Sequence, residues 1–394
     1  IDNDVVGVQI NYSAGTNTRL AGAIGLTPGA SFDKFKMFGG RKRCNVADDG
    51  TILAYYGDDG YKEDGSNGQV MVYQPKVYYL ILPLIYDKID DVVGGYHLRK
   101  ANYYVSLAER PGFKLHPAFI NENGEEVDYI LKSAFEGSIY DVSAGKYLTN
   151  DEQVMDATVD KLCSVANVKP CSGLTQSLTR DKVEQMAKNR GDGWHCSGIK
   201  DIALEQLLMM IELGSMNTQT NIGLGVVNVS DNTSYNCSAL TGSTSSLGNT
   251  TGRATSTVVT KGTEKTTYTD DDKTSITYRG VENFWGNIWK FAEGVNFYGD
   301  GHQRGGQPYI CKDFDYKEDF SSNNYEPAGF TLTNNNGYIS AIGYNPNFDW
   351  LFFASESKGD SSTPVGDYLY STPKLNDYRA ALLGGRWFDG SRDG

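Results

Sequence analysis

Turn signals containing glycine interrupt the first 65 residues of this chain at short intervals and leave room only for short strands. Small apolar runs alternate with Ser13-Ala14-Gly15, Pro28-Gly29, Gly39-Gly40, Asp48-Asp49-Gly50 and Asp58-Asp59-Gly60. Glycine reaches positive φ at no steric cost, and aspartate and proline favour tight turns, so these groups mark chain reversals. The pattern predicts a β-rich segment over residues 1–65.

Strand periodicity strengthens after this segment. Between Gln69 and Pro83, apolar residues stand at every second position on either side of Pro75, which predicts a strand pair or a bulged strand. Further strands or β/turn units are predicted over 103–107, 127–131, 277–297, 329–341, 350–355 and 378–388. Four of the five tryptophans lie in the last third of the chain, and we expect a dense core there.

Two helices are predicted between these β-rich regions. Thr179 is a suitable N-cap for a helix over 181–189, which has an acidic first turn and ends near Gly191 or Gly193. The second helix runs from Ile199 to Leu213, with Gly214 as its stop, and its apolar arc is wide. We therefore expect the second helix to be buried on more than one side.

A polar tract follows the helices. Of the 48 residues from Asn228 to Ser275, 21 are Ser or Thr, and the acidic run Asp270-Asp271-Asp272 lies near its end. A segment with so little apolar surface gains little from burial. We interpret it as a long surface insertion or loosely paired hairpins.

The charge balance excludes one class of partner. The chain has 36 Lys and Arg against 49 Asp and Glu, a net charge of −13, and no basic stripe, so we expect no nucleic-acid binding. Its longest apolar stretch, Val77–Tyr86, is too short for a membrane span and contains Pro83, so we expect no membrane insertion. The chain begins with Ile1, which we interpret as a cut or processed end.

Cysteine and histidine positions give little support for catalysis. The six cysteines have no C-x-x-C spacing; free buried thiols and a single Cys163–Cys171 bridge are the two interpretations. His195 and Cys196 are adjacent, but neighbouring side chains diverge, and no G-x-S-x-G or zinc-ligand spacing occurs. The chain has paired carboxylates such as Glu125-Glu126, so the residues that a glycosidase needs are present. These pairs lie in polar runs, however, which are typical of a solvated face.

The abundance of tyrosine and glycine has two interpretations. The chain contains 26 Tyr and 45 Gly. Tyrosines presented on glycine-rich loops are typical of recognition surfaces. Tyrosines lining half-buried strands are the other interpretation, and composition alone favours it.

Two segments of the last third resemble the formylglycine-generating-enzyme branch of the C-type lectin fold. The run YRGVENFWGNIWKF (278–291) is similar to the G-N-V-W-E-W element of that branch, and LLGGRW (382–387) is similar to its R-G-G-S-W strand. The order of two helices, a long insertion and these two motifs also agrees. The resemblance implies scaffold roles for Trp285, Asn287, Trp289, Gly384, Gly385 and Trp387.

This resemblance implies a fold class and a domain division. The fold would be α+β and C-type lectin-like. An N-terminal β-rich attachment segment, 1–65, would precede a lectin-like domain over 66–394, with 228–275 as a polar insertion. Because the chain stops at Gly394 inside the second motif, we expect the C-terminal end of the domain to be truncated.

A closer similarity is to phage structural proteins of that fold, which are often diversified by retroelements. It is carried by residues 174–194 (LTQSLTRDKVEQMAKNRGDGW), the helix up to Gly225, and the segments 308–311, 329–332 and 364–368. It implies a phage tail-tip or fibre adhesin, an extracellular homotrimer on the virion tail. Its partners would be a host-cell surface receptor, protein or glycan, and other tail proteins.

In such relatives the residues after the G-G-x-W strand vary and bind. The corresponding positions here are Arg386, Phe388, Asp389, Ser391 and Arg392. An aromatic, arginine and small polar set of this kind suits a binding hot spot. An ordinary turn at the chain end is the alternative for 386–394.

Departures from the family pattern imply no cofactor or metal and no enzyme. The generating enzyme has a C-terminal pair of copper-binding cysteines, whereas Cys311 is the single cysteine after the insertion. Sugar-binding C-type lectins use E-P-N and W-N-D for calcium, but Ala328 follows Glu326-Pro327 here, and Gly286 follows Trp285. A copper-dependent oxidase and a bacterial surface or structural module of the same fold stay as alternatives.

Overall fold

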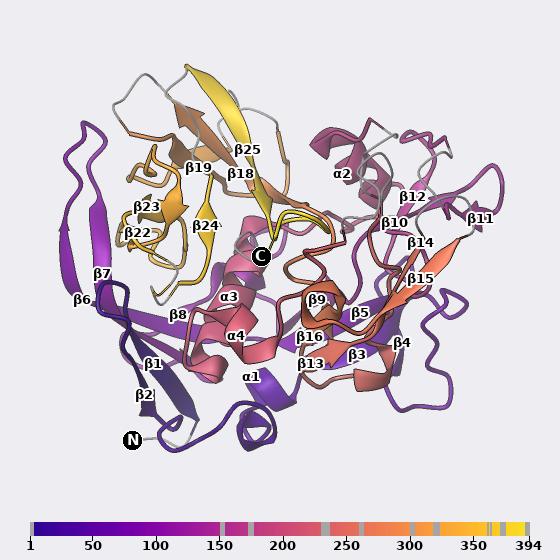
Figure 1. Cartoon of the computed structure of the whole chain (residues 1–394), viewed down its shortest axis with the longest axis horizontal. Coiled ribbons are helices and arrows are strands. Elements are labelled where there is room, and N and C mark those ends of the chain that lie inside the picture. Colours follow the sequence, from indigo (N-terminus) through magenta and orange to yellow (C-terminus); the bar gives the residue numbers. More distant parts are fainter. Residues whose placement is uncertain are drawn as a thin grey trace.

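The computed structural model describes residues 4–149, 154–171, 177–229, 237–259, 264–299, 304–317, 324–360, 362, 365–370 and 376–390. It is mostly β, with 36% strand and 13% helix, divided among several small antiparallel sheets (Figure 1). The expected α+β, C-type lectin-like fold is therefore wrong. Turn signals recur along the whole chain, so backbone pairing is spread over many short strands.

The largest sheet joins segments from both ends of the chain. Its strand order is β2 (Asn17–Ala21), β1 (Val5–Asn11), β7 (Tyr96–Ser106), β22 (Ala341–Tyr344) and β23 (Ala354–Glu356). The other edge of β7 pairs with β6 (Tyr78–Lys88), and the start of β6 pairs with β8 (Lys114–Leu115). The β6–β7 hairpin rises along the left side of the molecule in Figure 1.

Two further sheets have four strands each. The first has the order β4 (Ile52–Tyr55), β3 (Lys42–Val46), β5 (Gln69–Pro75) and β9 (Tyr129–Ser133). The second has the order β20 (Tyr325–Pro327), β19 (Gln307–Cys311), β18 (Lys290–Gly299) and β25 (Asp377–Leu383). In the second sheet, the two motif segments identified in the sequence become neighbours, because β18 pairs with β25.

Smaller sheets complete the described β structure. They are β11 (Lys146–Tyr147), β10 (Ser138–Asp141) and β12 (Lys161–Cys163); β13 (Gly252–Ala254), β16 (Ser275–Tyr278) and β17 (Val281–Glu282); β14 (Ser256–Val259) and β15 (Lys265–Tyr268); and β21 (Gly337–Tyr338) and β24 (Tyr368–Leu369).

Both predicted helices are confirmed. They are α2 (Arg180–Lys188), whose N-cap Thr179 accepts from the Lys182 N–H, and α3 (Ile199–Leu213), which ends at Gly214 in the left-handed conformation. The described residues also contain the short helices α1 (Lys36–Gly39) and α4 (Thr218–Ile222), and the 3-10 turns η1 (Ala30–Phe32), η2 (Pro117–Phe119), η3 (Ser245–Leu247) and η4 (Asp271–Lys273). As expected, α3 is buried on nearly all sides, and it packs against β1, β7 and β18.

Strands from the first 65 residues pair with strands that follow them. β1 pairs with β7 along seven residues, and β3 pairs with β5 along five. One hydrophobic core contains residues from Val6 to Ala381. Residues 4–65 therefore pack against the residues that follow them, in one shared core.

The polar tract is more deeply integrated than its composition predicts. β14 and β15 form the expected hairpin, but Thr241, Thr244, Ser256 and Ser275 are almost fully buried. The Thr244 hydroxyl donates to Glu282 Oε2 over 2.6 Å and accepts from Arg43 Nη2 over 3.0 Å. The description of this tract as a surface insertion is wrong for its buried part, because groups from distant segments bind the hydroxyls of Thr241 and Thr244.

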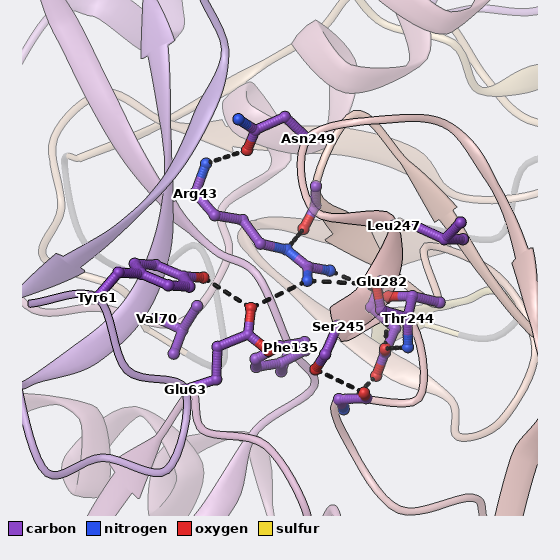
Figure 2. Close-up of polar contacts among 12 residues, drawn as sticks. Arg43, Tyr61, Glu63, Val70, Phe135, Thr244, Ser245, Leu247, Asn249 and Glu282 are labelled. Atoms are coloured by element: carbon purple, nitrogen blue, oxygen red, sulfur yellow. Dashed lines mark hydrogen bonds and ion pairs between the residues drawn. The ribbon is translucent and has the colours of Figure 1, made fainter. Parts of the chain in front are cut away.

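Arg43 is the centre of this attachment (Figure 2). Its guanidinium donates to Gly280 O over 2.9 Å and to Glu63 Oε1 over 3.2 Å, and its backbone N–H donates to Asn249 Oδ1 over 2.7 Å. Glu282 also accepts from the backbone N–H groups of Gly242 and Thr244. We call Arg43, Glu63, Thr244 and Glu282 the Arg43 clamp. It fastens the tract to β3 and β17.

Among the described residues, no helix combines the length and the apolar character that crossing a membrane requires.

Candidate functional site

The loop after β25 lies on a platform made by main-chain hydrogen bonds. Gly286 N–H donates to Gly384 O, and Trp387 N–H donates to Asn287 O over 3.0 Å. A second strap joins the loop to residues 226–229: Val229 N–H donates to Trp387 O over 2.6 Å, and Gly390 N–H donates to Val227 O over 2.9 Å. The first sequence motif therefore holds the loop on one side, and residues 226–229 hold it on the other.

Gly384 and Gly385 fit this platform because both adopt positive φ, at +88° and +67°. A Cβ on Gly384 would lie 3.1 Å from the Phe284 carbonyl oxygen. The scaffold role expected for Gly384 therefore has a steric basis, since a side chain there would strain the backbone and crowd the first motif.

Asn287 connects the platform to the interior. Its Oδ1 accepts from Ala239 N–H over 2.6 Å, and its Nδ2 donates to Glu136. Glu136 also pairs with Lys290 Nζ at 2.9 Å. Trp387 is buried in a small core with Val226 and Ile288. Asn287 and Trp387 thus occupy interior positions.

Above this platform, four side chains form what we call the Arg386 cluster: Trp289, Arg386, Phe388 and Asp389. Arg386 Nε donates to Asp389 Oδ1 over 2.9 Å. The guanidinium carbon lies 4.1 Å from the Phe388 ring centroid and 4.9 Å from that of Trp289. One carboxylate and two aromatic rings therefore hold the arginine in place, at distances suited to cation–π attraction.

The arginine still has donors to offer. Its side chain is 35% exposed, and among the described residues its two terminal nitrogens have no hydrogen-bond partner. A planar guanidinium with two free amino groups can bind a carboxylate, phosphate or sulfate group in a bidentate manner, or peptide carbonyls singly. The flat rings beside it offer apolar contact, so the cluster can combine stacking with directed hydrogen bonds.

Trp289 corrects one sequence expectation. The sequence predicts a dense core around the tryptophans of the last third, and Trp285 and Trp350 are indeed buried. Trp289 is instead 46% exposed. Its neighbour Ile288 turns into the small core, so the next side chain along the loop points outward. Ser391 and Arg392, the other two expected binding residues, lie outside the described residues.

A cavity at the start of α3 gathers ionisable groups but is too small for a substrate. Its lining includes Lys200, Asp201, Glu293, Cys311 and Tyr316, and its volume is about 10 Å³. A space of that size holds about one water molecule. Burial raises the pKa of Glu293 to about 7, although Arg180 opposes this effect. The cavity can hydrate a buried polar group, and the Arg386 cluster is the stronger candidate site.

His195 and Cys196 have structural partners. His195 Nδ1 lies 2.9 Å from Glu184 Oε1, and the Cys196 backbone N–H donates to Glu184 Oε2 over 2.9 Å. Burial raises the pKa of the Cys196 thiol well above its ordinary value, which disfavours the nucleophilic thiolate. One carboxylate therefore fixes this hinge between α2 and α3.

The six cysteines all lie within the described residues, four of them are buried, and no disulfide joins Cys163 to Cys171. This agrees with the first of the two cysteine interpretations and not with a Cys163–Cys171 bridge. Cys311 donates from its thiol to Asp313 O over 2.9 Å. Among the described residues, no second cysteine forms a disulfide with Cys311.

The chain matches no protein-family model and no curated protein. Its candidate site consequently rests on geometry and on the sequence motifs alone.

Proposed function

We propose that this protein is a receptor-binding component of a phage tail, and that the Arg386 cluster contacts a protein or glycan on the host-cell surface. The observation that carries the proposal is the pre-ordered arrangement of the exposed Trp289 with the half-buried Arg386 and Phe388. Aromatic residues and arginine dominate the energetics of binding sites, and fixing them in advance reduces the entropy lost on association.

The assignment to a phage tail rests on the sequence similarity to phage structural proteins. The genes that flank the coding sequence provide an independent check. Tail genes, or a reverse transcriptase with a template repeat, would support the assignment. Neighbours belonging to a bacterial surface operon would instead favour the bacterial module.

Removing either the Trp289 ring or the Arg386 guanidinium should abolish most of the binding to host cells. We expect Trp289→Ala and Arg386→Ala each to weaken binding by about 30-fold or more, the loss typical of a hot-spot residue. The measurement is binding of the labelled, purified full chain to a panel of intact bacterial isolates, by flow cytometry. Unfolding temperatures of the variants should be recorded in parallel, so that loss of binding is separated from loss of fold.

Arg379→Ala is the matched control. Arg379 has a similar side-chain exposure, 34%, and a similar ion pair, with Asp377 at 2.7 Å, and it lies on β25 just before the loop. It should bind like the unmodified chain. Equal binding of the same cells by Trp289→Ala, Arg386→Ala and the unmodified chain would remove the cluster from the proposed function.

A further inference from the structure

The outer part of β6 exposes an apolar row. Leu82, Leu84, Ile85 and Tyr86 are each between 41% and 51% exposed, while Tyr79 and Ile81, earlier in the strand, are buried in the core. Adjacent large apolar side chains on a surface are typical of an interaction site, whereas scattered single ones are ordinary. The row therefore needs an explanation that a monomer does not give.

The backbone of the same stretch is an open edge. β7 covers one edge of β6 along its length, but β8 pairs on the other edge with Tyr78 and Tyr79 alone. Within the described residues, no strand pairs with that edge from Leu80 to Lys88. Figure 1 shows β6 as the outermost strand on the left side of the molecule. An open apolar edge of this kind readily accepts another chain.

Two features of the sequence suit a second copy of this chain. The run Ile81-Leu82-Pro83-Leu84-Ile85 reads the same in both directions, so a two-fold axis near Pro83 would bring Leu82 of one copy beside Leu84 of the other. A two-fold interface must be self-complementary in this way. In addition, Val77–Tyr86 contains no charged residue, although the chain carries −13 overall. Two such acidic molecules approach most easily where the surface is neutral.

We propose that the open edge of β6 is a dimer interface, at which two copies of the chain associate about a two-fold axis near Pro83. Pro83 has no N–H, and the register of β6 shifts between Pro83 and Tyr86, so a long hydrogen-bonded ladder cannot form. The apolar side chains provide the contact, and a two-fold interface closes at two copies. This symmetry differs from the homotrimer implied by the resemblance.

The test is a charge-exchange experiment on the full chain. The unmodified protein should have twice the mass of one chain by light scattering coupled to gel filtration at micromolar concentration. The double variants L82E/L84E and L82K/L84K should each be monomeric, because the axis sets like charges beside each other. An equimolar mixture of the two variants should recover the dimer, which a misfolded variant could not do. Ile24→Glu, at an equally apolar exposed position outside β6, should stay dimeric.

A monomeric mass for the unmodified chain would overturn the proposal and leave the edge to a different protein partner. A trimeric mass would overturn the two-fold geometry. A dimer that persists in both double variants would place the interface elsewhere and would overturn the proposal as well.

Discussion

Replacing Glu205 with glutamine is expected to lower the free energy of unfolding by about 3–5 kcal/mol, the usual cost of leaving a buried charge without its partner. Glu205 lies on α3 and is fully buried, and its carboxylate binds two cations. Arg41 Nη2 lies 2.8 Å from Oε1, and Lys132 Nζ lies 2.8 Å from Oε2. A neutral side chain would leave both cations in the core without a counter-charge. Urea unfolding followed by tryptophan fluorescence measures the loss.

Arg253→Gln is the control, because it removes an arginine–carboxylate ion pair that is exposed to solvent. Arg253 pairs with Asp271 at 3.1 Å, and both side chains are about half exposed. Its loss should cost less than about 1 kcal/mol. A similarly small cost for Glu205→Gln would mean that water reaches the Glu205 site and that the pair is not a central element of the core.

Glu205→Gln should also change how the stability of the protein depends on acid pH. Burial alone would raise the pKa of Glu205, but Arg41 and Lys132 outweigh it and hold the pKa at about 2, below its usual 4.5. Because the unfolded chain binds this proton first, the stabilisation is complete above pH 4.5 and is lost as the pH falls toward 2. This group should contribute about 3 kcal/mol to the acid-induced loss. In Glu205→Gln, the decline over this interval should be shallower by that amount; an unchanged slope would contradict the lowered pKa.

Arg43→Met is expected to destabilise the protein by about 3 kcal/mol and, below the unfolding temperature, to release the polar tract. Methionine retains much of the apolar stem but none of the donors that reach Gly280, Glu63 and Thr244. Glu63 and Glu282 would then have lost the guanidinium charge beside them. Hydrogen exchange should report faster exchange over 237–259, and limited proteolysis should cut there first.

Lys42→Met is the matched control, since Lys42 lies on the same strand with its side chain exposed. It should leave both the stability and the exchange pattern unchanged. If Arg43→Met unfolds the chain without any selective loosening of 237–259, then the Arg43 clamp stabilises the whole core and does not specifically fasten the tract.

Local signals predicted the helices well. The cap at Thr179 and the stop at Gly214 are properties of neighbouring residues, and both are where the sequence places them. Sheet membership has no such signal. Val5–Asn11 pairs with a strand about 90 residues later, and only complementary burial of distant segments selects that partner. The resemblance to an α+β fold failed for the same reason, because motif order does not determine strand pairing.

The polar tract and Trp289 show two further limits. Hydropathy predicts exposure for Thr244, yet Arg43 and Glu282, distant in sequence, make its burial favourable. Trp289 is a large aromatic residue of the kind expected in a core. It points outward because the turn buries its neighbour Ile288 instead. Trp289 and Arg386 are far apart in the sequence and close only in the fold, so sequence periodicity could not predict that they meet.

The platform under the Arg386 cluster has a consequence for mutational tolerance. The hydrogen bonds that fix residues 384–390 to 226–229 and 286–287 join main-chain atoms. Main-chain bonds do not depend on which side chain stands at 386. The side chains of Asp389 and Phe388, by contrast, also hold the loop: Asp389 Oδ2 accepts from the Arg386 backbone N–H over 3.1 Å, and Phe388 packs against the small core around Trp387. Residue 386 can therefore be replaced without breaking the main-chain bonds that fix the loop, whereas replacements at 388 and 389 would also remove a contact of the loop itself.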